Sequence, residues 1–229
     1  MILNLDHLIF EYQIGKNSFV NLENKEARQT SFLSVSKNLT AFATNGKIYM
    51  VDNQNNVLQT INYDFEIISG TIPFCGQLSN DGKLLAFHNK VGEIQIIDTS
   101  NGKTIQKIVA DFKMAEQMAF VNNNDLLVVR EQYGTWGMRY FDLAGNKEVK
   151  MNSLDIPEYT KEVRTFCFND DQSKLVLVQQ TNAYVFDFKA KKLLHSFGIE
   201  HAVKTCGIKF VGEKLGVRTD YGCFSLYHV

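Results

Sequence analysis

The stretch GQLSNDGKLLAFHNKVGEIQIIDTSNGKTIQKI, from Gly76 to Ile108, decides the fold. It holds two apolar segments joined by a polar turn, then two segments in which apolar and polar residues alternate, as half-buried strands require. The third segment ends in an aspartate, and the equivalent aspartates follow one another at intervals of 46, 44 and 45 residues: Asp52, Asp98, Asp142 and Asp187. A regular period of this length is typical of stacked supersecondary units. The sequence therefore predicts a repeat fold in which each unit supplies one small four-stranded sheet.

The turns within each unit are short and polar, for example SNDGK at Ser79–Lys83 and TSNGK at Thr99–Lys103. Asn, Asp and Gly tolerate the positive φ that tight hairpin turns need. We therefore predict an all-β chain, a single β-propeller domain over residues 1–229 with about five four-stranded blades. The last unit stops before a fourth strand, whereas Ile9–Leu22 supplies a pair of strands alone, so we expect the N-terminal strands to complete the C-terminal blade. Such closure would remove the exposed sheet edges that an open ring would leave.

The third strand of four units ends in an apolar or aromatic residue followed by aspartate: Val51-Asp52, Ile97-Asp98, Phe141-Asp142 and Phe186-Asp187. In this respect the repeat resembles the blades of WD-repeat β-propellers, in a divergent form without Trp-Asp or Gly-His dipeptides. The resemblance implies a rigid disc whose loops hold a protein or a peptide, since the fold by itself gives no chemistry. The four aspartates are expected to cap the turns that follow them.

The composition excludes several classes of partner. Lys and Arg number 24 against 25 Asp and Glu, a formal net charge of −1, which gives no attraction to nucleic acid or to anionic membranes. The N-terminal sequence has no basic segment before its apolar residues, and no apolar run approaches the roughly 20 residues of a membrane span. The four cysteines lack CxxC spacing and are interpreted as buried thiols: Cys75, Cys167, Cys206 and Cys223. These features favour a cytoplasmic protein, and they leave its oligomeric state open.

The third unit departs from the others between its second and third strands. The segment REQYGTWGMRY, from Arg130 to Tyr140, replaces turns of about four residues and contains the only tryptophan of the chain. Trp, Tyr and Arg dominate the energetics of protein interfaces, so we predict partner contacts from Arg130, Tyr133 and Trp136. The alternative is that Trp136 folds back over a neighbouring blade.

Acidic residues recur in the connections between units. We expect them on one rim of the propeller, where they would attract a basic partner: Asp64, Glu66, Asp111, Asp155 and Glu158, with Glu200 in the last connection. The alternative is that these charges only keep the surface soluble.

No catalytic motif, phosphate-binding loop or metal-ligand spacing occurs, so neither a cofactor nor a metal is predicted. The leading hypothesis is a non-catalytic protein that binds another protein through its loops. An inhibitor or immunity protein that neutralises a toxin or enzyme is one alternative, and a self-associating structural platform is another. A glycoside-processing propeller would need carboxylates near the innermost strands. The expected inner segments SFLSVS, CGQLS, QMAFV, RTFCF and KTCGIKF contain none.

Overall fold

The computed structural model describes residues 2–5, 8–13, 18–21, 32–44, 47–54, 56–62, 75–111, 113–132, 137–149, 162–200, 205–219 and 222–229. This described part contains twenty-two strands and no helix. The chain divides into two compact units, Met1–Phe112 and Lys113–Val229, and each has a hydrophobic core within it.

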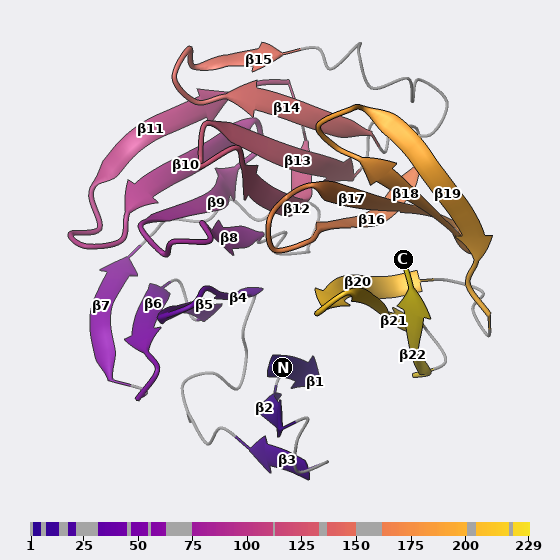
Figure 1. The fold of residues 1–229 in the computed structure, drawn as a ribbon. Helices are drawn as coiled ribbons and strands as arrows, with labels where there is room; N and C mark the ends of the chain where they lie inside the picture. The colour runs from indigo at the N-terminus through magenta and orange to yellow at the C-terminus, as the bar shows by residue number, and fades with distance from the viewer. Residues whose placement is uncertain are drawn as a thin grey trace. The chain divides into compact units, whose positions relative to one another are not determined.

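The described residues of the first unit form three antiparallel sheets, in which strands consecutive in the chain pair side by side (Figure 1). The first sheet has three strands, β1 (Ile2–Leu5), β2 (Leu8–Gln13) and β3 (Ser18–Asn21). The second has β4 (Phe32–Val35), β5 (Leu39–Thr44), β6 (Lys47–Asp52) and β7 (Val57–Asn62). The third has β8 (Gly76–Leu78), β9 (Leu84–Lys90), β10 (Glu93–Asp98) and β11 (Thr104–Val109).

The described residues of the second unit repeat this plan. One sheet has β12 (Met114–Val121), β13 (Leu126–Gln132), β14 (Met138–Asp142) and β15 (Lys147–Val149). The next has β16 (Val163–Phe168), β17 (Lys174–Gln179), β18 (Asn182–Asp187) and β19 (Lys192–Gly198). The last has three strands, β20 (Thr205–Val211), β21 (Lys214–Thr219) and β22 (Phe224–His228).

The second and third sheets of the first unit pack against each other. Ile48 and Met50 share one face of β6 because side chains alternate along a strand, and both are buried in the cluster that contains Phe87 of the next sheet. A Cβ atom at Gly76 would lie 2.6 Å from the Phe32 ring, so this close approach of strand to ring requires glycine. The Ser34 hydroxyl also accepts a hydrogen bond of 2.8 Å from the backbone N–H of Leu78. Apolar contact and a buried hydrogen bond thus join these two sheets.

In the second unit the side chain of one glutamine joins two neighbouring sheets. The Gln117 amide on β12 accepts hydrogen bonds from Phe166 N and Thr165 Oγ1, each 3.1 Å long, and donates one of 2.6 Å to Phe166 O. Its amide group therefore satisfies both backbone polar groups of one β16 residue, as a neighbouring strand would. Around this contact lies a cluster of apolar side chains from the two sheets, including Tyr140 and Leu175.

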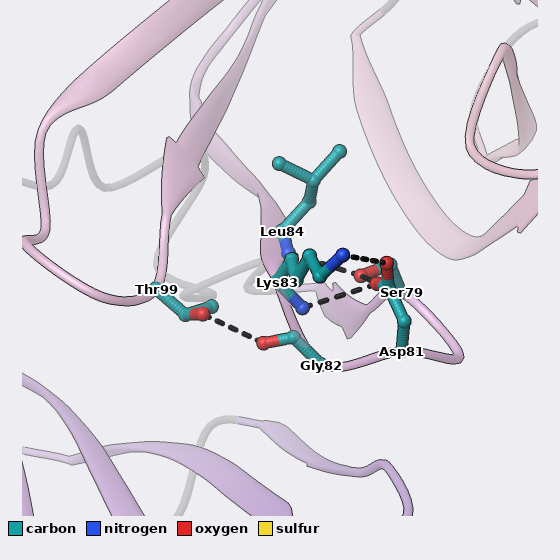
Figure 2. A network of polar contacts seen from close by, with 6 residues as sticks. All are labelled: Ser79, Asp81, Gly82, Lys83, Leu84 and Thr99. Atoms are coloured by element: carbon teal, nitrogen blue, oxygen red, sulfur yellow. Dashed lines mark hydrogen bonds and ion pairs between the residues drawn. The ribbon is translucent and has the colours of Figure 1, made fainter.

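The polar turns have the geometry that their composition predicts. In the β8–β9 turn, Asp81 accepts hydrogen bonds from the Ser79 hydroxyl at 2.7 Å and from Lys83 N at 3.1 Å (Figure 2). Gly82 has φ +73°, a conformation that a side chain would strain. Its carbonyl accepts a 2.6 Å hydrogen bond from the Thr99 hydroxyl, which ties this turn to the one after β10.

The prediction that the repeated aspartates cap turns is confirmed. Asp52, Asp98, Asp142 and Asp187 each accept a hydrogen bond from a backbone N–H two or three residues further on, at 2.7–3.1 Å. Two hydrogen bonds from Ser100 hold the pKa of Asp98 below its usual range. The bond from its hydroxyl has the larger effect, and the bond from its backbone N–H has the smaller. These carboxylates therefore belong to the scaffold.

The fold is an all-β β-propeller built from small antiparallel sheets, as the sequence predicts. The described part contains four complete four-stranded blades, with a three-stranded sheet near each end of the chain. One expectation was incomplete: β1 precedes the two N-terminal strands that the sequence analysis identified, and it pairs with β2 from Ile2↔Glu11 to Leu5↔Leu8. Completion of the C-terminal blade by N-terminal strands, and a single domain over residues 1–229, stay predictions.

Candidate binding site at the β13–β14 hairpin

The hairpin of β13 and β14 differs from the equivalent hairpins of the sheets that come before and after it in the chain. Val91 and Gly92 alone separate β9 from β10, and Gln180 and Thr181 alone separate β17 from β18. Gly92 and Gln180 have φ of 72° and 50°, as such tight turns require. In contrast, residues 133–137 lie between β13 and β14. The repeat is therefore interrupted where the sequence analysis placed its principal site.

The two strands stay in register up to the start of this insertion. Their pairing runs from Leu126↔Asp142 to Arg130↔Met138, and Glu131 N then donates a 3.2 Å hydrogen bond to Gly137 O. Tyr133 and Trp136 lie outside the described residues. What the structure describes is the base from which the inserted segment leaves.

Arg130 is buried at this base. Its guanidinium forms an ion pair with Glu116 of β12 and donates a 3.3 Å hydrogen bond to Val163 O of β16. Glu116 sits where the pairing of β12 with β13 shifts register, and such a bulge redirects the side chain it carries. A buried charge is costly unless it is paired and hydrogen-bonded, and Arg130 is both. Its side chain connects three strands from two blades.

Arg139 on β14 makes a second set of charged contacts. It binds both carboxylate oxygens of Glu148 on β15, with Nε–Oε1 at 2.9 Å and Nη2–Oε2 at 2.5 Å. Its Nη1 lies 4.0 Å from an Oε2 oxygen of the buried Glu131, and its guanidinium carbon is 5.6 Å from the centre of the Phe141 ring. The two-pronged pair fixes the orientation of the guanidinium as well as its position.

Glu131 connects the base to the residue that precedes β12. Its Oε1 accepts a hydrogen bond of 3.2 Å from Lys113 N, and its Oε2 faces Arg139. We call the five charged residues the anchor cluster; they form two separate sets, Arg130 with Glu116, and Arg139 with Glu131 and Glu148. Its described contacts are ion pairs and hydrogen bonds that join neighbouring strands near this hairpin.

Charges within the anchor cluster are unequally exposed. The side chains of Arg130 and Arg139 are 5% and 15% exposed, whereas those of Glu116 and Glu148 are 38% and 43% exposed. Carboxylates rather than guanidiniums therefore face solvent at the base of the hairpin.

The other sequence-predicted contacts are only partly described. Asp111 is exposed near the end of the first unit, while Asp64, Glu66, Asp155 and Glu158 lie outside the described residues. The described residues therefore bring no two of these five acids together. The acidic rim stays a prediction, as does a partner contact by Arg130, whose side chain is occupied by internal interactions.

Sequence reasoning missed four members of the anchor cluster. Glu131 adjoins Arg130 in the chain. Arg139 and Glu148 lie on either side of the turn LAGN, so their opposite charges could have predicted an ion pair across the β14–β15 hairpin. Glu116 also corrects the expectation that no inner strand carries an acid. β12 begins at Met114, earlier than expected, and so includes this glutamate.

Among the described residues, no group of His, Cys, Asp and Glu is arranged to hold a metal ion. Cys75 is buried, whereas Cys167 and Cys223 are half-buried, and burial raises the pKa of the Cys167 thiol. No helix in this part of the chain has the length and hydropathy needed to span a bilayer.

No protein-family model matches the chain, and a search of the curated proteins finds no significant match. The class of protein is therefore defined by its fold, a β-propeller.

Proposed function

We propose that this chain is a non-catalytic, cytoplasmic, WD-repeat-like propeller that binds another protein through the segment between β13 and β14, with Tyr133 and Trp136 as the principal contacts. The observation that carries the proposal is the anchor cluster, on and beside the two strands that flank residues 133–137, where the sheets before and after in the chain have two-residue turns. Charged groups of this kind are expensive to bury, and here they brace one hairpin of the repeat.

Bracing of this kind supports binding for a physical reason. A partner that docks on a hairpin pays the entropy of ordering it, and a base already held by ion pairs and hydrogen bonds lowers that cost. Tryptophan and tyrosine bury large areas with few rotatable bonds, so they gain most from a fixed base.

The exposed carboxylates of the anchor cluster favour a basic partner. Glu116 and Glu148 are 38% and 43% exposed, while the side chains of Arg130 and Arg139 are 5% and 15% exposed, so carboxylates are the charged groups that a partner would meet first at the base of the hairpin. An inhibitor or immunity protein acting on a basic toxin or enzyme would use such a surface. Raising the salt concentration should then slow association.

The experiment compares the wild-type chain with Trp136→Ala in affinity capture from a lysate of the source organism, followed by calorimetry on any purified partner. We expect Trp136→Ala to weaken binding by about 2 kcal/mol, or roughly 30-fold. Phe224→Ala is the matched control, since it truncates an exposed aromatic side chain on β22. Equal affinity of wild type and Trp136→Ala would exclude the hairpin as the binding surface.

A further inference from the structure

We draw no further inference here: the strongest candidate, the apolar face of the three-stranded sheet β20–β22 on which Phe224 and Leu226 are about half exposed, carries nothing because nothing in the structure shows what covers it.

Discussion

Arg139 and Glu148, on adjacent strands of the same blade, form a two-pronged ion pair with N–O distances of 2.9 and 2.5 Å. The guanidinium also lies near the buried Glu131, so this pair links the outermost strand of the blade to the base of the β13–β14 hairpin. The contribution of each of these contacts to stability can be measured by replacing one side chain at a time.

Glu148→Gln should have a small effect on stability. The carboxylate is well exposed, so water screens the pair and its loss should lower the free energy of unfolding by only about 0.5 kcal/mol. Urea denaturation measures the change, with Glu200→Gln, at an exposed position on the second unit, as the matched control. A loss well above 1 kcal/mol would mean that solvent does not reach this pair.

Arg130→Ala should be far more damaging than the loss of Glu148. The change removes a buried guanidinium that pairs with Glu116 and bonds Val163 O. Because Glu116 is partly exposed and can be hydrated, the cost comes mainly from lost packing and from the lost hydrogen bond to the Val163 carbonyl, about 2 kcal/mol. Arg218→Ala, at an exposed position on β21, is the control and should stay within about 0.5 kcal/mol of wild type. Denaturation of both variants under one condition decides the comparison, and equal stabilities would contradict a bracing role for Arg130.

Gln117→Ala should destabilise the second unit by about 2 kcal/mol, because the Phe166 N–H and C=O would both lose their partner inside the protein. Thr165→Val removes only one hydrogen bond to the same amide and should cost less. The midpoints of urea unfolding give the order of the two effects. The reverse order would show that the contact with the backbone of β16 contributes little.

The sequence predicts the regular part of this molecule well and its anchor cluster poorly. The period of the closing aspartates predicts the blades, and turn chemistry predicts the caps at Asp52 and Asp98, because both depend on residues close together in the chain. The contact of Arg130 with Glu116 depends instead on a register shift within β12, which no local pattern announces. The hydrogen bonds from Gln117 to the backbone of β16 join two blades, so they too could not be predicted from residues close together in the chain.

Glu93 gives the fold a dependence on acid that can be isolated. Its buried carboxylate at the start of β10 is desolvated, which by itself raises its pKa, but Asn89, Lys107 and Lys90 outweigh that effect and leave the pKa below its ordinary value of 4.5. A carboxylate whose pKa is lower in the folded than in the unfolded chain contributes stability that is fully present well above its unfolded pKa. That contribution is lost as the pH falls from about 4.5 through the folded pKa.

Glu93→Gln should therefore lower the free energy of unfolding at pH 7 and flatten its decline below about pH 4.5. Urea unfolding at a series of pH values, for wild type and variant, gives the difference between the two curves. The two exposed lysines would lose their buried counter-charge, so Lys107→Met should reproduce part of the change at neutral pH. A constant difference between wild type and Glu93→Gln from pH 7 to pH 3 would show that this carboxylate has the same pKa in the folded and unfolded chains.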